Sequence, residues 1–131
     1  LRDILGRLRQ APIRGLDLFS YAGAWGLNAL AAGVKSVDFV DQGEFTTEVQ
    51  RALELNGFSE RGRFHRADVF KFLDETAYSG PYDLIMCDPP AFAKSSGQKD
   101  QALDGYSKLH RKVLKAASAE AVVVFSSCTH Y

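Results

Sequence analysis

The sequence predicts an α/β fold in which helices cover both faces of one parallel β-sheet. Short apolar runs typical of buried strands alternate strictly along the chain with segments whose apolar residues recur at helical spacing. Strands that are apolar throughout are typical of parallel sheets buried on both faces. The chain has 131 residues, of which 46% are hydrophobic. That is enough for one core, so residues 1–131 are expected to form a single domain.

The expected elements follow one another without an internal repeat or a low-complexity linker. Gly33 and the pair Asn56–Gly57 are typical helix ends and close two of the helices. Polar residues dominate 91–102, which is therefore expected to be the one long loop. Strands are expected at 15–19, 36–40, 63–67, 82–87 and 121–125, and helices at 1–8, 24–32, 45–55, 69–73 and 103–117.

The composition excludes several classes of protein. No apolar run approaches the roughly 20 residues of a membrane span, and the first ten residues lack the apolar core of a signal peptide. A cytoplasmic protein without a membrane partner is therefore expected. Cys87 and Cys128 have no neighbour at disulfide or metal-ligand spacing, so free thiols and no metal are expected.

Charge is unevenly distributed, although sixteen basic and sixteen acidic side chains cancel overall. Residues 94–115 carry six basic and two acidic side chains, a net charge of +4, whereas residues 38–88 carry five basic and eleven acidic ones, a net charge of −6. The basic stretch could contact nucleic-acid phosphates, and a solvated helix face explains it equally well. Its members are Lys94, Lys99, Lys108, Arg111, Lys112 and Lys115.

Candidate ligand-binding residues follow the expected strands, because open parallel sheets bind ligands outside the carboxyl ends of their strands. Gly23 lies in the turn after the first strand, where the absence of a Cβ lets the backbone approach a ligand. Asp41 ends the second strand and could accept hydrogen bonds from both ribose hydroxyls of an adenosine cofactor. A plain strand–helix connection and a helix cap are the alternative explanations. A pyrophosphate site would need G-x-G-x-x-G, whereas Tyr21 and Trp25 flank Gly23 here, which favours a phosphate-free cofactor such as S-adenosylmethionine.

The third and fourth strands are each followed by an acid. Asp68 could accept the amino group of an adenine, with Val69 and Phe70 as walls of the ring, or it could cap the following helix. Asp88 is followed by two prolines, which fix the backbone. Held in this way, the Asp88 carboxylate could bind the edge of a nucleic-acid base while Phe92 stacks on its face.

The two cysteines differ in their surroundings. Cys87 lies in the apolar run of the fourth strand and is expected to pack on the face of the sheet opposite to Asp88. Cys128 follows the fifth strand among hydroxyl residues. Because the fourth and fifth strands are expected to be neighbours, Cys128 should face Asp88 across the same end of the sheet. The sequence therefore predicts a nucleophilic thiol at Cys128.

The order and spacing of these motifs resemble the bacterial large-subunit ribosomal RNA cytosine-5 methyltransferases that usually carry an N-terminal PUA domain. The resemblance covers nearly the whole chain. It rests on DLFSYAG at 17–23, Asp41, ADVF at 67–70, DPPAF at 88–92, Gly105–Tyr106 and Ser127–Cys128. It implies a Rossmann-like class I methyltransferase fold whose last two strands are missing here, without a PUA domain before Leu1.

The resemblance also implies roles for individual residues. Asp88 and Cys128 would be catalytic, since the Cys128 thiolate would add to C6 of a flipped-out cytosine and make C5 nucleophilic toward the methyl group. The residues implied to bind S-adenosylmethionine are Ser20, Tyr21, Gly23, Asp41, Asp68, Val69 and Asp88. Those implied to contact the substrate base are Pro89, Pro90, Phe92 and Lys94.

The expected function is therefore C5-methylation of a cytosine in large-subunit ribosomal RNA, with RNA as the partner. Two alternatives remain open. The Asp-Pro-Pro-x-Phe residues alone could methylate a nitrogen of guanine or adenine in RNA or DNA, or the chain could be a cofactor-binding core that is inactive on its own. The early end of the sheet also predicts an exposed edge at 122–125, and with it pairing into a homodimer.

Overall fold

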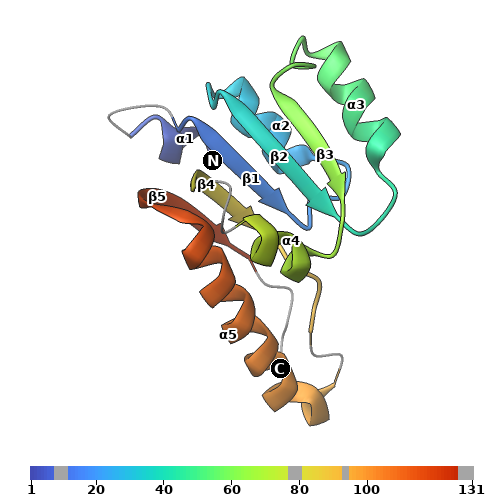
Figure 1. Cartoon of the computed structure of the whole chain (residues 1–131), viewed down its shortest axis with the longest axis vertical. Coiled ribbons are helices and arrows are strands. Elements are labelled where there is room, and N and C mark those ends of the chain that lie inside the picture. The colour runs from blue at the N-terminus through green and yellow to red at the C-terminus, as the bar shows by residue number, and fades with distance from the viewer. Residues whose placement is uncertain (8–11, 77–80, 93–94, 127–131) are drawn as a thin grey trace.

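The structure is a computed structural model, and it describes residues 1–7, 12–76, 81–92 and 95–126. Its five strands form one parallel sheet in the order β3-β2-β1-β4-β5 (Figure 1), which confirms the expected α/β fold. The strands are β1 (Arg14–Leu18), β2 (Ser36–Asp41), β3 (Gly62–Arg66), β4 (Tyr82–Cys87) and β5 (Ala117–Phe125). The helices are α1 (Arg2–Leu5), α2 (Ala24–Ala31), α3 (Thr46–Leu55), α4 (Val69–Thr76) and α5 (Lys99–Ala116), with a short 3₁₀ helix, η1, at Ser96–Gln98.

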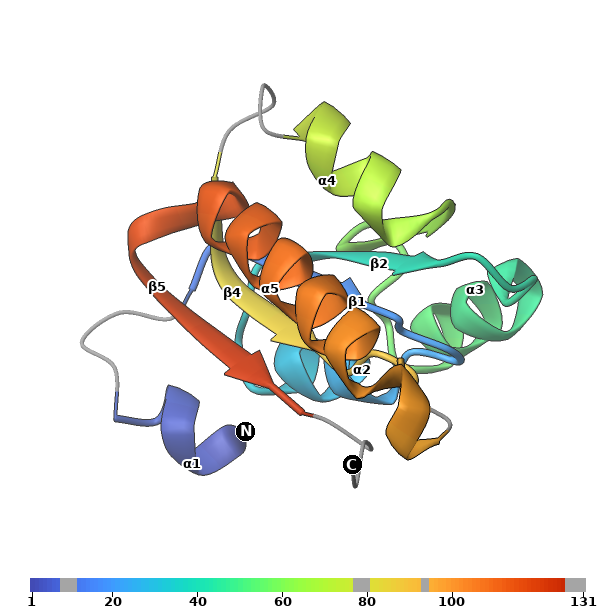
Figure 2. The same ribbon diagram turned by 90° about the horizontal axis from the view of Figure 1, so that it is seen from below.

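Helices cover both faces of the sheet, with α4 on one side and α1 and α2 on the other (Figure 2). Successive side chains of β4 point to opposite faces, as a pleated strand requires. Ile85 and Cys87 pack in a core with Leu109 of α5, whereas Leu84 and Met86 pack in a second core with helices α1 to α3. The buried position expected for Cys87 is therefore confirmed.

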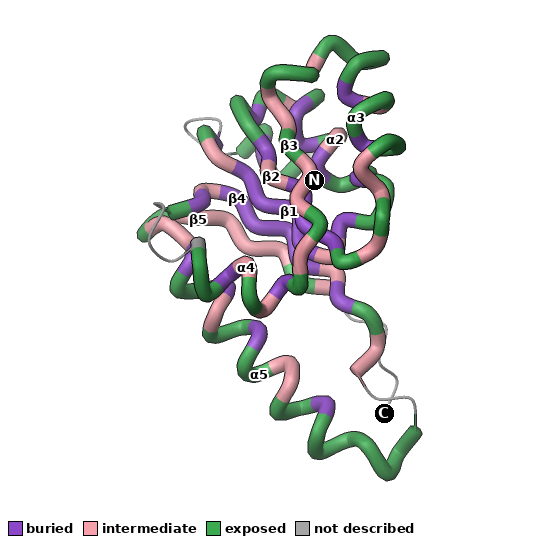
Figure 3. The backbone as a smooth tube through the Cα atoms, turned by 45° about the vertical axis from the view of Figure 1, so that its right-hand side comes forward, coloured by how far each residue is buried: buried purple, intermediate pink, exposed green. Residues whose placement is uncertain are grey.

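The centre of the sheet is buried, and its β5 edge is more open (Figure 3). Within the described residues β5 pairs with β4 alone, its residues 121–124 are half-buried and Phe125 is exposed. The predicted edge at 122–125 is thus confirmed for this part of the chain, and the homodimer stays a prediction. None of the helices described has both the length and the apolar character needed to cross a membrane. The cytoplasmic location also stays a prediction.

The connection between β4 and β5 differs from the expectation. The long loop predicted at 91–102 is wrong in its second half, because η1 forms at Ser96–Gln98 and α5 begins at Lys99, four residues before the predicted start. The first turns of α5 are almost entirely exposed, so no apolar periodicity marked them. Ala117, predicted to end this helix, instead begins β5.

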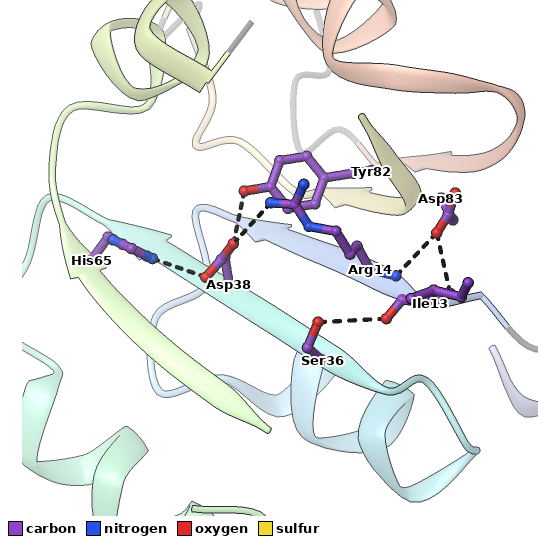
Figure 4. A network of polar contacts seen from close by, with 7 residues as sticks. All are labelled: Ile13, Arg14, Ser36, Asp38, His65, Tyr82 and Asp83. Carbon is purple, nitrogen blue, oxygen red and sulfur yellow. Dashed lines mark hydrogen bonds and ion pairs between the residues drawn. The ribbon is translucent and has the colours of Figure 1, made fainter. Parts of the chain in front are cut away.

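A network of polar side chains joins four strands (Figure 4). The Asp38 carboxylate of β2 accepts a hydrogen bond from the Tyr82 hydroxyl at 2.7 Å and lies 3.0 Å from Nε2 of His65. The Arg14 guanidinium lies 3.9 Å from the same carboxylate and 4.4 Å from the centre of the Tyr82 ring. The Asp83 carboxylate accepts the Arg14 amide at 3.0 Å. These contacts hold β1 to β4 together and so fix where their carboxyl ends meet.

Gly26 allows α2 to pack directly on the sheet. An added Cβ would lie 2.3 Å from Cε1 of Phe39, whose side chain is completely buried. Gly26→Ala should therefore lower the free energy of unfolding by about 1–3 kcal/mol, since the core must shift to make room. Chemical denaturation measures this change. The matched control is Gly97→Ala, where an added Cβ meets nothing closer than 3.9 Å. Equal stability of the two variants would contradict the packing described.

Candidate functional site

The carboxyl ends of the strands meet where the order of the sheet reverses direction. From β1 the chain proceeds to β2 and β3 on one side, and it then crosses back to β4 on the other side of β1. Ligands of open parallel sheets bind at this position. The segments that follow the strands there are 19–23 after β1, 42–43 after β2, 67–68 after β3 and 88–92 after β4.

The turn between β1 and α2 has an uncommon backbone conformation. Phe19 and Tyr21 have φ angles of 57° and 49°, and Gly23 has a φ angle of 93°. A left-handed backbone is unfavourable for residues with a Cβ, so tertiary contacts must hold this turn. The Ser20 amide donates to the Val40 carbonyl at 3.1 Å, and the Gly23 amide donates to the Ser20 carbonyl at 2.8 Å. The turn is thereby attached to β2 with the Tyr21 side chain exposed.

The core residue next to Gly23 leaves little room for a side chain at this position. An added Cβ would lie 3.0 Å from Cε1 of Phe39, in addition to the strain from its positive φ. The structure thus explains glycine here by packing and backbone conformation. The close approach to a ligand that the sequence suggests stays a prediction.

Asp41 connects the turn after β1 with the turn after β2. Its Oδ2 accepts the Tyr21 amide at 2.9 Å, and its Oδ1 accepts the Gly43 amide at 2.8 Å. A carboxylate oxygen can accept two hydrogen bonds. The Asp41 carboxylate can therefore hold both turns and still accept hydrogen bonds from a ligand.

Asp68 caps α4, one of the two roles the sequence allowed. Its Oδ1 accepts the Lys71 amide at 3.1 Å. The side chain is exposed, and within the described residues its Oδ2 accepts no hydrogen bond. That oxygen remains available to a ligand.

A cavity of about 280 Å³ lies between these segments. Residues that follow all four strands contribute to its lining, namely Phe19, Tyr21, Asp41, Gln42, Asp68, Val69, Phe70, Pro90 and Phe92. Five of them, Tyr21, Asp41, Asp68, Val69 and Phe70, are residues that the sequence assigns to the cofactor. Pro90 and Phe92 are residues that it assigns to the substrate. The cavity thus brings seven candidate residues together from four separate segments.

The other candidate residues lie beside this cavity or outside the described part of the chain. Ser20 is buried, and its hydroxyl lies 3.4 Å from the Tyr21 carbonyl. Asp88 is half-buried and Pro89 is buried, next to the cavity residue Pro90. Lys94 and Cys128 fall outside the described residues, so their roles stay predictions.

Asp88 has a partner that the sequence did not identify. The Ser126 hydroxyl donates to Oδ1 of Asp88 at 2.5 Å, and the Ser126 amide donates to the Cys87 carbonyl at 3.0 Å. The pairing of β5 with β4 is what brings these residues together. Serine occupies both 126 and 127 in the sequence. Only the register of β5 against β4 identifies Ser126 as the partner of Asp88.

Asp17 is a second residue that the sequence did not assign to the site. It is 2% exposed, and its Oδ2 accepts the Gly26 amide at 2.9 Å. Burial raises the pKa of Asp17 to about 7, the Gly26 amide opposes the change, and the charges of Asp41 and Asp88 add to it. The charges of Asp41 and Asp88 thus lie close enough to affect the buried Asp17 at this end of the sheet, and two such negative charges favour a cationic ligand. An acidic residue inside an otherwise apolar strand was the feature of the sequence that could have identified Asp17 as a site residue.

Phe92 belongs to an aromatic cluster that joins the segment after β4 to α4 and α5. The centre of its ring lies 4.4 Å from that of Tyr106, with an angle of 32° between the planes, and 6.4 Å from that of Phe70. The Phe92 amide also donates to the Tyr106 hydroxyl at 3.3 Å. Nζ of Lys108 lies 5.7 Å from the centre of the Phe70 ring, which places a positive charge beside the cavity wall.

Comparison with known sequences gives one family and a set of similar enzymes. The profile of the family described as conserved hypothetical protein 95 matches residues 4–126. Ribosomal RNA large subunit methyltransferase I of Vibrio cholerae is 35% identical over 119 residues, which are 87% of this chain and 30% of that protein. The enzyme of the same name from Tolumonas auensis is 34% identical over 131 residues, 98% of this chain and 33% of that protein. The chain thus spans about a third of the length of these relatives.

Solved structures of methyltransferases share the fold. A protein described as a methyltransferase and solved with S-adenosylhomocysteine has a TM-score of 0.79 and 27% identity, over 98% of this chain and 34% of its own. An S-adenosylmethionine-dependent methyltransferase from Agrobacterium tumefaciens has a TM-score of 0.78 and 23% identity, over 98% of this chain and 42% of its own. The described fold is therefore the Rossmann-like fold of these enzymes.

Proposed function

We propose that this chain, which belongs to the family described as conserved hypothetical protein 95, is the cofactor-binding and catalytic domain of an S-adenosylmethionine-dependent methyltransferase that acts on large-subunit ribosomal RNA. The observation that carries the proposal is the cavity at the switch point of the sheet. It gathers Tyr21, Asp41, Asp68 and Phe92 from the ends of four strands. The names of the Vibrio and Tolumonas relatives support ribosomal RNA as the substrate.

The residues of the cavity fit the adenosine part of S-adenosylmethionine. Asp41 offers the remaining lone pairs of a buried carboxylate to the ribose hydroxyls, and Asp68 offers Oδ2 to the adenine amino group. Val69 and Phe70 supply apolar walls for the ring. When bound, the cofactor supplies an electrophilic methyl group on a cationic sulfur, and the negative charges of Asp41 and Asp88 favour that cation.

An RNA partner is supported by the position of the basic stretch. Lys108, Arg111 and Lys115 are exposed on α5, and Lys108 lies against the cavity wall. Lys112 differs from them, because it forms an ion pair with Asp74 of α4. We infer that Lys108, Arg111 and Lys115 contact phosphates of the RNA that presents the base.

We further propose that the methyl acceptor is C5 of a cytosine. The Cys128 thiolate forms a bond to C6, C5 accepts the methyl group, and loss of the C5 proton to a base expels the thiolate. The Asp88 carboxylate accepts a hydrogen bond from the amino group on the N3 and amino edge of the base, while Pro89, Pro90, Phe92 and Lys94 contact its surroundings. The protein contributes orientation and exclusion of water.

Transfer of a tritiated methyl group to unmodified ribosomal RNA, followed by nucleoside analysis, tests this function in the protein of natural length. The expected product is 5-methylcytidine in large-subunit RNA, and RNA that contains 5-fluorocytidine should form a covalent adduct. Label in a methylated guanine or adenine without an adduct would instead support nitrogen methylation. Tight binding of S-adenosylhomocysteine without any transfer would overturn the proposal and leave a cofactor-binding core.

Removal of the Asp41 carboxylate should weaken cofactor binding. Asp41→Ala is expected to reduce the affinity for S-adenosylhomocysteine by roughly 1.5–3 kcal/mol, because charge-assisted hydrogen bonds to the ribose are lost. Loss of the amide contacts to Tyr21 and Gly43 adds to the effect. Calorimetric titration measures it, with Glu48→Ala on the exposed face of α3 as the control. Unchanged affinity in Asp41→Ala would show that the ribose role is wrong.

A further inference from the structure

The segment 88–92 carries the residues proposed to face the substrate base. It has few backbone hydrogen-bond donors that could fix its conformation. Pro89 and Pro90 have no amide hydrogen, so only three backbone donors remain in five residues. One of these, the Asp88 amide, lies 3.5 Å from the Leu18 carbonyl. Contacts from other elements must therefore fix the segment.

Ser126 holds the first end of the segment. Its hydroxyl donates to Oδ1 of Asp88 at 2.5 Å, and its backbone is fixed by the bond from its amide to the Cys87 carbonyl. Within the described residues the second carboxylate oxygen, Oδ2, accepts no hydrogen bond. The bond to Oδ1 thus sets the direction of the carboxylate and leaves Oδ2 for a ligand.

Tyr106 of α5 holds the other end. Its hydroxyl accepts the Phe92 amide at 3.3 Å, and its ring stacks on the Phe92 ring with centres 4.4 Å apart. The neighbouring Gly105 makes this approach possible, since an added Cβ there would lie 3.1 Å from Cδ2 of Phe92. One face of Phe92 is therefore backed by Tyr106, while Phe92 also lines the cavity.

We propose that Ser126 and Tyr106 are positioning residues that clamp segment 88–92 at both ends, so that the Asp88 carboxylate and the Phe92 ring are preorganised for the methyl-accepting base. This inference rests on the proposed function. It assigns a role to the Gly105–Tyr106 pair that the sequence singled out, and it adds Ser126, directly after β5, which no motif identified. A preformed contact surface lowers the loss of conformational freedom when the base binds, and it aligns the base for transfer.

The test uses single variants of the protein of natural length. Ser126→Ala removes the hydroxyl bonded to Asp88, and Tyr106→Phe removes the hydroxyl bonded to Phe92 but keeps the stacked ring. Both should lower kcat for methyl transfer to RNA by roughly 10- to 100-fold and leave the affinity for S-adenosylhomocysteine within about twofold. Ser126→Thr, which retains a hydroxyl, should restore most of the activity. Ser107→Ala, on the exposed face of α5, is the control.

Two results would overturn the inference. One is wild-type kcat in both Ser126→Ala and Tyr106→Phe. The other is an equal fall in kcat and in cofactor affinity, without rescue by Ser126→Thr, which indicates a general structural defect.

Hydrogen exchange separates this inference from the proposed function. In Tyr106→Phe the Phe92 amide should exchange at least about tenfold faster than in the wild type, whether or not the protein methylates RNA. Unchanged exchange at Phe92 would overturn the clamp even in an active enzyme. Failure of the wild-type protein to transfer any methyl group would overturn the proposed function instead.

Discussion

Replacement of Cys128 by alanine should reduce methyl transfer to RNA on the order of 10³-fold or more, about 4 kcal/mol of transition-state stabilisation, while S-adenosylhomocysteine binds with nearly unchanged affinity. The reason is that the thiol is proposed to contact the base and not the cofactor. Without the bond to C6, C5 of cytosine is a poor nucleophile. Initial rates with ribosomal RNA and a calorimetric titration with S-adenosylhomocysteine measure the two quantities.

Cys87 provides the matched control for this experiment. It is 2% exposed, and burial, together with the charges of Asp88 and Asp17, raises the pKa of its thiol to about 12. At neutral pH this thiol is protonated and therefore not a nucleophile. Cys87→Ala should keep the activity and lose only some stability. Full activity of Cys128→Ala would rule out the covalent mechanism and favour nitrogen methylation, which needs Asp88 but no thiol.

Replacement of Asp17 by asparagine should remove a strong dependence of stability on pH. The pKa of Asp17 is raised from an ordinary value of 3.8 to about 7, chiefly by burial. Between these two values the unfolded chain has lost the proton and the folded chain retains it. The free energy of unfolding of the wild type therefore falls as pH rises through this window, by on the order of 4 kcal/mol in total. Asp17→Asn has no such group, and the amide oxygen of Asn can still accept the Gly26 amide.

Denaturation curves at several pH values between 4 and 8 measure this difference, and curves extended below pH 4 measure the control. Asp38→Asn is the control, because the Asp38 carboxylate changes the free energy of unfolding with pH in the opposite direction. Burial tends to raise the pKa of Asp38, but hydrogen bonds from His65 and Tyr82, with the charges of His65 and Arg14, lower it overall. Asp38 thus stabilises the fold above its unfolded pKa, and this contribution is lost as pH falls. Parallel pH profiles for the wild type and Asp17→Asn would contradict the assignment of Asp17.

Most of the fold could be predicted from the sequence because its strands are short and apolar. The run at 82–87 matches β4 at both ends, and the expected parallel sheet is correct. The boundary between α5 and β5 could not be placed, since the sequence Ala-Ser-Ala-Glu at 117–120 has neither helical nor strand periodicity. Pairing of Ala117 with Tyr82 makes it part of β5, and this is a tertiary effect.

The candidate site was predictable where a residue ends a strand or lies a few positions after one. Asp41, Asp68 and Phe92 line one cavity because parallel strands end at the same edge of the sheet. The hydrogen bond of Ser126 to Asp88 depends on the register of β4 and β5, and the contact of Tyr106 with Phe92 depends on how α5 packs. Neither is encoded in local spacing. These contacts therefore became evident only in the three-dimensional structure.

The most direct test of the proposed site is a crystal structure of the protein with S-adenosylhomocysteine. We expect the adenosine part in the cavity between Asp41 and Asp68, with the ribose hydroxyls within hydrogen-bond distance of the Asp41 carboxylate and the adenine against Val69. We also expect the sulfur to point toward Asp88. Density for the nucleoside elsewhere on the molecule, with this cavity empty at a saturating concentration of S-adenosylhomocysteine, would contradict the proposed site.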